Sequence, residues 1–232
     1  MKIPLSARLR ACCNYIPKGT RVADVGTDHG YLGIWLLQQG IASSIIASDI
    51  VPGPLSTARR NAVKYGFADK MEFYLSDGVR SIPRDFDVMV CAGMGADTMV
   101  SILSAAQWLK SGQYTLVLQC QSKTPMLRRY LSENGWRITE ETVVQDGKFL
   151  YTVMDVCWQP DYPRLTPGQW YFPPALLKNP AKELPAYYSR VLEGLRLAAA
   201  RKTDPQLTEA LAELSALEQV YNRPKEAPYD NG

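Results

Sequence analysis

Residues 21–33 read Arg-Val-Ala-Asp-Val-Gly-Thr-Asp-His-Gly-Tyr-Leu-Gly, a short apolar strand that runs directly into a glycine-rich turn. Gly26 lets the backbone turn sharply out of the strand and approach a ligand closely. In a dinucleotide-binding turn, the GxGxxG spacing directs a helix N-terminus at a pyrophosphate. Here Thr27-Asp28-His29 replaces that spacing and places a carboxylate where phosphates would lie. The turn therefore disfavours an anionic cofactor and suits a cationic one.

Segments of strand length and helix length alternate outward from this turn. Apolar or aromatic runs that suit strands span 21–25, 44–48, 71–75, 86–92 and 114–120. Helical stretches are expected between them, near 31–39, 54–65, 96–110 and 125–134. An earlier helix, capped by Ser6, carries on one face Leu5, Leu9, Cys12 and Ile16. This alternation predicts a parallel sheet that helices cover on both faces, with right-handed crossovers.

The last two expected strands, 136–145 and 148–156, are separated only by Asp146-Gly147. A two-residue Asp-Gly link favours a type I′ turn, so these strands must be antiparallel. A nicotinamide-binding Rossmann domain ends instead with a parallel strand that follows a helix. A sheet that is parallel up to a terminal antiparallel hairpin is typical of a class I methyltransferase. The sequence therefore predicts an α/β fold with a Rossmann-like class I methyltransferase sheet.

The composition changes after Trp158, where five prolines within 158–174 indicate an ordered but irregular connector. A helix then carries an apolar stripe of Leu184, Tyr188, Val191, Leu195 and Ala198. Thr203-Asp204-Pro205 begins a second helix, with a stripe of Leu207, Leu211, Leu214, Leu217 and Tyr221. Together they predict an antiparallel, coiled-coil-like helical hairpin. We expect a methyltransferase domain over 1–158, the connector and hairpin over 159–222, and a disordered tail over 223–232.

Charge is distributed unequally over this hairpin. The segment 178–202 holds two acids and six cations, which are Lys178, Lys182, Arg190, Arg196, Arg201 and Lys202. The segment 204–221 holds four acids and no base. Two interpretations remain open: the paired helices neutralise one another, or the first helix binds RNA phosphates.

Composition narrows the class of protein. The 232 residues are 46% hydrophobic and 21% charged, as in a globular protein with a sizeable core. No apolar run approaches the roughly 18 residues of a membrane span, and Arg8 and Arg10 interrupt any signal peptide. We therefore expect a cytoplasmic protein without a membrane partner. We also expect it to act as a monomer.

Cysteine and histidine usage argues against a metal site. The five cysteines form no CxxC pair, and their odd number fits reduced thiols better than a disulfide framework. The single histidine, His29, excludes a histidine-rich metal centre. The net charge of +3 permits a nucleic-acid partner without arguing strongly for one.

Acids follow successive strands of the expected sheet. Asp49 ends the second strand, where an acid can accept both ribose hydroxyls of an adenosyl group. Asp77 follows the third strand and is suited to accept from an adenine amino group, with Gly78 leaving room for the ring. Together with the turn after the first strand, these acids predict nucleoside binding in the crevice at the carboxyl edge. Each of them alone would equally fit a strand-end cap or a turn.

The segment Cys91-Ala92-Gly93-Met94-Gly95 follows the fourth strand, at the usual edge of a methyl-transfer pocket. Methyltransferases that act on exocyclic amines often carry Asn/Asp-Pro-Pro-Tyr there, and this chain does not. The paired glycines suggest instead a flat backbone wall against which a planar base can lie. Methylation of a ring nitrogen fits better, because its lone pair is nucleophilic without prior deprotonation.

The chain resembles the bacterial tRNA (adenine-22 N1)-methyltransferase family, TrmK, over nearly its whole length. The resemblance rests on LSARL (5–9), GTDHGYLGI (26–34), CAGMGA (91–96), DGKFLY (146–151) and LTPGQWYFPPALL (165–177). It departs at Gly33, where the family usually has proline, and at Ala96, where a third glycine is usual. The resemblance implies that adenine N1 in a tRNA attacks the methyl group of S-adenosylmethionine.

Site residues are expected as follows. The residues expected to bind S-adenosylmethionine are Asp24, Gly26, Asp49, Ile50, Asp77, Gly78, Ala92 and Gly93. The residues expected to contact the base are His29, Tyr31, Met94 and Gly95. Asp28 is the catalytic candidate, since a carboxylate stabilises a cationic product; a helix cap near Gly30 is its alternative role. For His29 the alternative is packing beside the turn.

Two other functions remain as alternatives. A small-molecule methyltransferase would need a lid over its substrate, which the helical hairpin could supply. A non-catalytic RNA-binding protein would use S-adenosylmethionine structurally, although the set of four aspartates argues against it.

Overall fold

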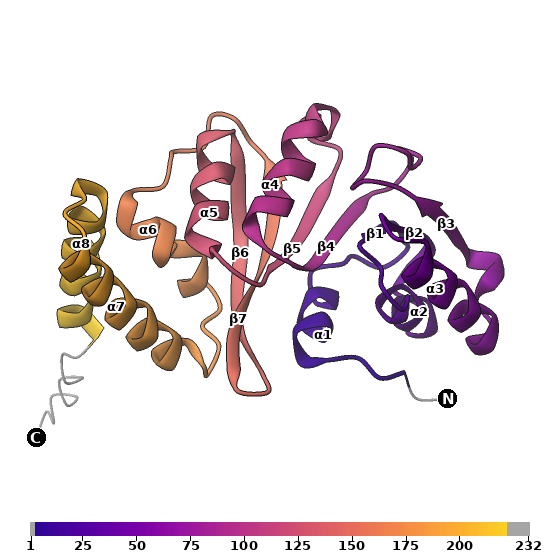
Figure 1. Ribbon diagram of the computed structural model, residues 1–232, viewed down its shortest axis with the longest axis horizontal. Helices are drawn as coiled ribbons and strands as arrows, with labels where there is room; N and C mark the ends of the chain where they lie inside the picture. Colours follow the sequence, from indigo (N-terminus) through magenta and orange to yellow (C-terminus); the bar gives the residue numbers. More distant parts are fainter. Residues whose placement is uncertain (1–2, 222–232) are drawn as a thin grey trace, which may run out of the picture.

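The fold is that of a computed structural model, which describes residues 3–221. A seven-stranded sheet runs through its middle in the order β3-β2-β1-β4-β5-β7-β6, with α3 and α8 near opposite ends of the long axis (Figure 1). The strands are β1 (Thr20–Val25), β2 (Ala42–Asp49), β3 (Met71–Leu75), β4 (Val88–Met94), β5 (Thr115–Cys120), β6 (Trp136–Asp146) and β7 (Phe149–Trp158).

The strand directions confirm the predicted fold class. Strands β1 to β5 pair in parallel, whereas β7 is antiparallel to both β5 and β6. Because two antiparallel steps separate β5 from β6, these two strands point the same way. The turn after β6 therefore lies at the carboxyl edge of the sheet, together with the ends of β1 to β5.

The turn between β6 and β7 differs from the prediction in type. Asp146 pairs with Phe149, so the two central residues are Gly147 and Lys148 rather than Asp146-Gly147. Of these two, only Gly147 has a positive φ, at 60°. A positive φ at the first central residue alone, occupied by glycine, is the pattern of a type II′ turn. The antiparallel pairing is confirmed, and the type I′ turn is wrong.

Helices cover both faces of the sheet. The helices are α1 (Ala7–Cys13), α2 (Tyr31–Gln38), α3 (Pro52–Tyr65), α4 (Ala96–Ala105), α5 (Thr124–Glu133), α6 (Pro167–Tyr171), α7 (Leu184–Arg201) and α8 (Pro205–Tyr221). Short 3₁₀ turns lie at Ala68–Lys70, Gln107–Leu109 and Pro174–Leu177. Ser6 is the N-cap of α1, as predicted, because its hydroxyl accepts from the Leu9 backbone N–H. The helix expected over 96–110 ends at Ala105, since Ala106 leaves the helical region at φ −111°, ψ 56°.

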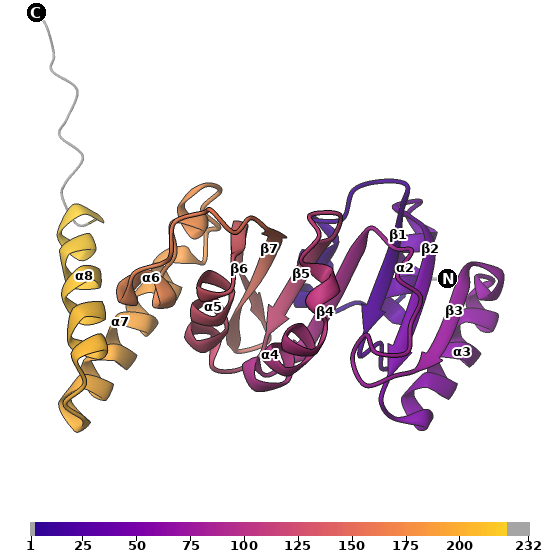
Figure 2. The ribbon, with the colours of Figure 1, turned by 90° about the horizontal axis from the view of Figure 1, so that it is seen from above.

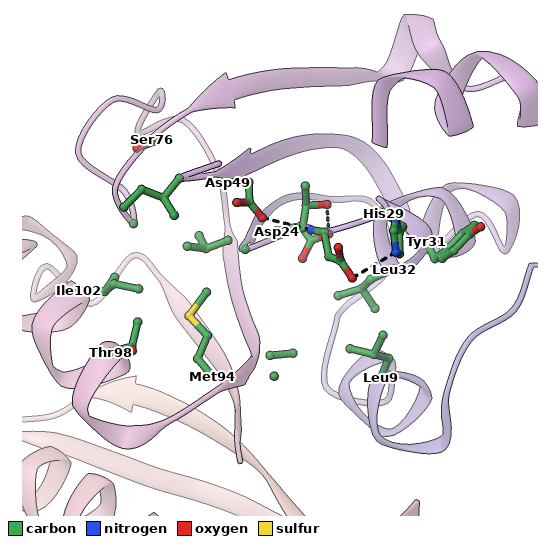
Figure 3. A pocket seen from close by; sticks show the side chains of 18 of the residues that line it. Leu9, Asp24, His29, Tyr31, Leu32, Asp49, Ser76, Met94, Thr98 and Ile102 are labelled. Atoms are coloured by element: carbon green, nitrogen blue, oxygen red, sulfur yellow. Dashed lines mark hydrogen bonds and ion pairs between the residues drawn. The ribbon is translucent and has the colours of Figure 1, made fainter. Parts of the chain in front are cut away.

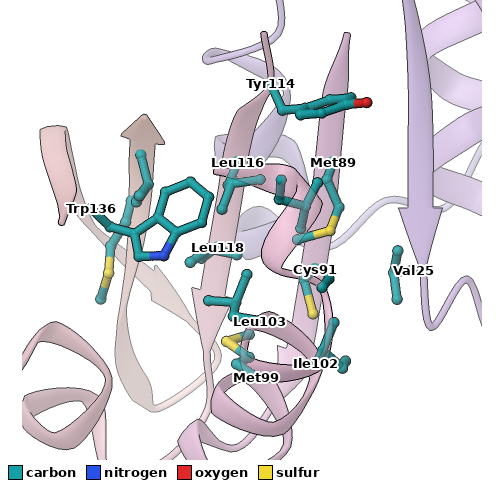
Figure 4. Packing of buried hydrophobic residues seen from close by; sticks show 14 of the residues in the cluster. Val25, Met89, Cys91, Met99, Ile102, Leu103, Tyr114, Leu116, Leu118 and Trp136 are labelled. Atoms are coloured by element: carbon teal, nitrogen blue, oxygen red, sulfur yellow. The ribbon is translucent and has the colours of Figure 1, made fainter. Parts of the chain in front are cut away.

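Alternating side chains of the strands divide the core into two apolar clusters. One cluster joins α1, α2 and α3 to one face of the sheet and includes Cys12, Ile34 and Val90. The other joins α4 and α5 to the opposite face (Figure 4), where Met99 and Leu118 lie among its buried side chains. Side chains that alternate between two covered faces are the expected arrangement for parallel strands.

Gly33 accounts for the close packing of α2 on the sheet. A Cβ at this position would lie 2.9 Å from Ile45 Cγ2 and 3.2 Å from Met71 Cε. The helix therefore approaches β2 and β3 at a distance that a larger side chain would increase. This packing holds the turn before α2 close to the ends of β1 and β2.

A buried arginine joins the C-terminal helices to the sheet. Arg128 on α5 is fully buried and donates to Glu141 on β6 through Nη2 at 2.6 Å and through Nε at 3.1 Å. Its Nη1 donates to the carbonyls of Trp170 and Tyr171 at 3.0 and 2.8 Å, and Nη2 also donates to the Tyr187 hydroxyl at 3.0 Å. One guanidinium thus connects α5, β6, α6 and α7, four elements that lie next to one another in Figure 2.

The predicted helical hairpin forms, but the buried stripe of α7 includes Tyr187 and Leu192 in place of two predicted residues. Leu184, Tyr188 and Leu195 are buried, as the stripe on the first helix predicts. Val191 and Ala198 are half-buried and line a groove beside α7. One ion pair within the described residues crosses from α7 to α8, between Arg196 and Glu218 at 2.9 Å. The side chain of Tyr221 and the tail expected over 223–232 lie outside the described residues.

Candidate functional site

The ends of β1 to β4 enclose a cavity of about 450 Å³ at the carboxyl edge of the sheet (Figure 3). Twelve of the thirteen site residues expected from sequence line it: Asp24, Gly26, Asp28, His29, Tyr31, Asp49, Ile50, Asp77, Gly78, Ala92, Gly93 and Met94. These residues come from loops far apart in the chain, and parallel strands bring them together because their carboxyl ends share one edge.

Gly95 is the expected residue that does not line the cavity. It precedes α4 as the N-cap, and a Cβ there would lie 3.0 Å from Ser122 Oγ. Its α-carbon therefore faces the loop after β5 and not the cavity. The β4–α4 and β5–α5 loops are joined here, because the Gln121 backbone N–H donates to the Met94 carbonyl at 2.8 Å.

Asp24 is a buried acid at the bottom of the cavity. The Thr27 hydroxyl donates to its Oδ2 at 2.7 Å, and no cation pairs with it among residues 3–221. Burial raises the pKa of the Asp24 carboxyl to about 6, against the lowering effect of the Thr27 hydrogen bond. The neighbouring carboxylates of Asp49 and Asp28 raise this pKa further. A cation in the cavity would relieve this cost.

Asp49 connects two neighbouring loops. Its Oδ1 accepts from the Val51 backbone N–H at 2.9 Å, and its Oδ2 accepts from the Asp28 backbone N–H at 3.4 Å. Asp77, at the next strand end, is exposed and forms an ion pair with Arg80 at 3.2 Å. These two acids border the side of the cavity formed by β2 and β3.

Asp28 does not cap a helix, so that alternative is wrong. The N-cap of α2 is Gly30, in the left-handed conformation at φ 72°, and no side chain accepts there. Asp28 itself has φ 52°, a strained value for a residue other than glycine. Its carboxylate is 68% exposed, and its Oδ2 lies 3.6 Å from His29 Nε2. This geometry leaves the carboxylate free to face a ligand.

His29 lies at the opening of the cavity and is not packed in the core. Its ring is 52% exposed and lies 5.8 Å from the ring of Tyr31. Tyr31 packs edge-on against Tyr65 at 6.5 Å, which orients its ring. Both rings border the same part of the cavity as Asp28.

The glycines of the cavity allow close approach of backbone segments. A Cβ on Gly26, whose φ is 76°, would lie 2.2 Å from Met94 Cε. A Cβ on Gly78 would lie 2.9 Å from Ile102 of α4. The positive φ of Gly26 and the contact of Gly78 with Ile102 both favour glycine, whereas the flexible end of Met94 could move away from a Cβ on Gly26.

Sequence reasoning missed part of the lining. Arg8 and Leu9 reach the cavity from α1, and Thr98 and Ile102 reach it from α4. Thr27, Leu32, Val25 and Ser76 complete the lining from positions beside the expected residues. Arg8 lies in the LSARL segment, which contributes only to the family resemblance. No spacing of residues in that segment indicates that α1 lies beside β4.

Arg8 is held against the glycine wall by two side chains. Its Nη1 donates to Gln119 Oε1 at 3.0 Å, and its Nε lies 3.4 Å from Asp146 Oδ2. The Gly93 backbone N–H donates to the same Gln119 oxygen at 3.1 Å. The turn after β6 thus supports α1 and, through it, one wall of the cavity.

Two kinds of feature are absent from the part of the chain that the structure describes. Within residues 3–221, no group of three or more histidine, cysteine, aspartate or glutamate side chains is suited to hold a metal ion. In the same residues, no helix combines the length and apolar character needed to span a membrane.

Comparisons with known proteins agree with this geometry. Residues 5–154 match the model of a family described as a methyltransferase domain. The tRNA (adenine(22)-N(1))-methyltransferase of Bacillus subtilis is 30% identical over 154 residues, which are 66% of this chain and 65% of that protein. The matches cover less than two thirds of the first curated relatives, at 65%, 60% and 61% of their lengths.

Two solved structures are similar over almost the whole chain. A Streptococcus agalactiae protein of the NADB-Rossmann superfamily is 31% identical, with a TM-score of 0.78, over 94% of this chain and 96% of that one. A putative tRNA (m1A22) methyltransferase of Streptococcus pneumoniae is 25% identical, with a TM-score of 0.80, over 94% and 99%. The latter protein has also been solved in complex with S-adenosyl-L-methionine.

Proposed function

We propose that this chain, which belongs to the methyltransferase-domain family, transfers a methyl group from S-adenosylmethionine to N1 of an adenine in tRNA. The observation that carries the proposal is the cavity at the carboxyl edge, lined by four aspartates and by the Gly93–Met94 wall. The named activity of the Bacillus subtilis relative supports position 22 as the target. With tRNA as substrate, we also propose the cytoplasm as the place of action.

The acids of the cavity fit a cationic adenosyl cofactor. Asp24 is buried, no cation pairs with it among residues 3–221, and a ligand ammonium group would stabilise its ionised form. Asp49, at the end of β2, is suited to the ribose hydroxyls, and Asp77, at the end of β3, to the adenine amino group. S-adenosylmethionine supplies an electrophilic methyl group when bound.

The opposite wall fits a planar base and excludes thiolate chemistry. Gly93 has φ 80° and exposes backbone to the cavity, beside Met94 and Arg8. Burial raises the pKa of the adjacent Cys91 thiol to about 12, so this thiol stays protonated at neutral pH. A covalent step through the Cys91 thiolate is therefore unavailable. The methyl group must then pass directly to the substrate, and an atom that is nucleophilic without deprotonation suits this direct transfer. Adenine N1 is such an atom.

The residues that line the cavity promote methyl transfer by orienting the base and by stabilising its positive charge. The walls of the cavity hold N1 in line with the methyl group, and alignment of this kind contributes about 7–11 kcal/mol in favourable systems. As N1 forms its bond to the methyl carbon, the sulfur–methyl bond breaks and its electron pair stays on sulfur as a neutral thioether, so the positive charge passes to the adenine ring. The Asp28 carboxylate stabilises that charge and accepts a hydrogen bond from the N6 amino group. His29 and Tyr31 border the same part of the cavity and contact the base.

The affinity for S-adenosylmethionine is expected to decrease as the pH falls below 6. Asp24 has a pKa of about 6 without ligand, and a cationic ligand binds its ionised form, so binding at lower pH must first remove a proton. Between pH 7 and pH 5 we expect about a tenfold loss of affinity, measured by titration calorimetry. Asp24→Asn should bind more weakly and lose this pH dependence. Equal affinities of the wild-type protein at pH 7 and pH 5 would contradict the proposal that Asp24 binds the cationic group of S-adenosylmethionine.

Mass spectrometry of nucleosides tests the function itself. Unmodified tRNA is incubated with the protein and S-adenosylmethionine, then digested and analysed for 1-methyladenosine. We expect 1-methyladenosine in tRNA and none when adenine 22 is replaced by guanine. Transfer to free adenosine but not to tRNA would favour a small-molecule methyltransferase. Binding of both tRNA and S-adenosylmethionine without transfer would favour a non-catalytic RNA-binding protein.

A further inference from the structure

A second hollow lies beside the cavity, between the β5–α5 loop and α7. It has a volume of about 320 Å³ and is lined by Gln121, Ser122, Lys123, Thr124, Pro125, Leu150, Tyr171, Tyr187, Arg190, Val191, Gly194, Leu195 and Ala198. This hollow is called the α7 groove here. Its lining contains two cations, Lys123 and Arg190, and no acid. The cavity, by contrast, is lined by four aspartates.

The α7 groove adjoins the methyl-transfer wall directly. The Gln121 backbone N–H donates to the Met94 carbonyl at 2.8 Å, and the Ala96 N–H donates to the Ser122 carbonyl at 3.1 Å. Met94 lines the cavity, whereas Gln121 and Ser122 line the groove. Because these loops are hydrogen-bonded to each other, a polymer with one residue in the cavity can continue directly into the groove.

The two cations of the groove differ in how they are held. Arg190 is exposed on α7 and has no hydrogen-bond or ion-pair partner among residues 3–221. Lys123 is 62% exposed, and its Nζ pairs with Asp97 at 2.8 Å. Lys123 also has a left-handed backbone, with φ 58°. Strained residues of this kind cluster at functional sites.

We propose that the α7 groove binds the sugar-phosphate backbone of the RNA next to the nucleotide that enters the cavity, with Arg190 and Lys123 on its phosphates. This inference rests on the proposed function. Charge complementarity favours a polyanion, because the lining holds two cations and no acid: Arg190 has no partner among residues 3–221, and Lys123 shares its charge with Asp97, which lies outside the lining. The hydroxyl groups of Ser122 and Thr124 add donors suited to phosphate or ribose oxygens. Arg196, which pairs with Glu218, does not line the groove.

The test measures binding of a tRNA transcript by Arg190→Ala at several salt concentrations. We expect the Kd for tRNA to rise about three- to tenfold at low salt, and the slope of log K against log salt to decrease in magnitude by about 1. The affinity for S-adenosylmethionine should stay unchanged, since Arg190 does not line the cavity. Lys123→Asn should have the same effects, because asparagine tolerates the left-handed conformation.

The matched control is Arg60→Ala, which removes the same charge from exposed α3, away from the α7 groove (Figure 1). We expect wild-type tRNA binding from this variant. Equal weakening by Arg60→Ala and Arg190→Ala would overturn the inference, since the effect would then follow net charge. Unchanged binding by both Arg190→Ala and Lys123→Asn would also overturn it. If the wild-type protein methylates tRNA in either case, the proposed function stands while the groove assignment fails.

Discussion

Asp28→Asn is expected to lower kcat for tRNA methylation by about 10²- to 10³-fold while the Kd for S-adenosylmethionine changes by less than about threefold. Asparagine keeps the left-handed backbone at φ 52°, because it tolerates that conformation better than most residues. It also keeps a hydrogen-bond acceptor for the N6 amino group. The main loss is therefore the negative charge that stabilises the cationic adenine. Single-turnover kinetics with calorimetry separates the two quantities.

Asp49→Ala is the contrasting variant for this prediction. The Asp49 carboxylate lines the cavity at the end of β2, where we propose that the ribose binds, and accepts from the Val51 and Asp28 backbone N–H groups. Its removal should weaken S-adenosylmethionine binding by about ten- to a hundredfold, as expected for lost hydrogen bonds to a charged group. If Asp28→Asn instead abolishes S-adenosylmethionine binding, Asp28 is a cofactor ligand and its catalytic assignment is wrong.

Arg128→Ala is expected to destabilise the protein by about 3–5 kcal/mol, because it leaves the buried Glu141 carboxylate without its partner. It also removes the donors to the Trp170 and Tyr171 carbonyls. For a chain of this size the midpoint of thermal unfolding should fall by roughly 10 °C. Thermal unfolding followed by circular dichroism measures this shift.

Arg60→Ala is the control for stability, because it removes an arginine from a helix distant from α6, α7 and α8. Arg60 is exposed on α3 and donates within that helix, to Ser56 Oγ at 3.4 Å and to Thr57 Oγ1 at 3.0 Å. Exposed contacts of this kind contribute about 1 kcal/mol or less, so the midpoint should fall by no more than a few degrees. Equal shifts for the two variants would mean that the buried guanidinium does not join the C-terminal helices to the sheet. Restoring apolar packing with Arg128→Met and Glu141→Leu together should recover much of the loss.

The sequence predicted most of the cavity because its residues sit at strand ends. Asp24, Asp49 and Asp77 each mark the end of a strand, and parallel strands end at one edge. The positions of these acids relative to the strands therefore predicted that their side chains lie close together in the fold. The role of Asp28 as a helix cap was misjudged, because Gly30 adopts the positive φ that begins α2 without a side-chain cap. Turn chemistry of this kind depends on one residue's dihedral angles and is weakly encoded in residue type.

The sequence alone determined the alternation of strands and helices, the antiparallel end of the sheet and the acids at its carboxyl edge. These features depend on local hydrophobic periodicity and turn residues, which act over a few positions. Tertiary structure alone decided that Arg8 borders the cavity, that Arg128 joins α5 to α6 and α7, and that Lys123 and Arg190 share one groove. Each of these contacts joins segments distant in the chain, and their geometry follows from packing of whole elements, which no local spacing records.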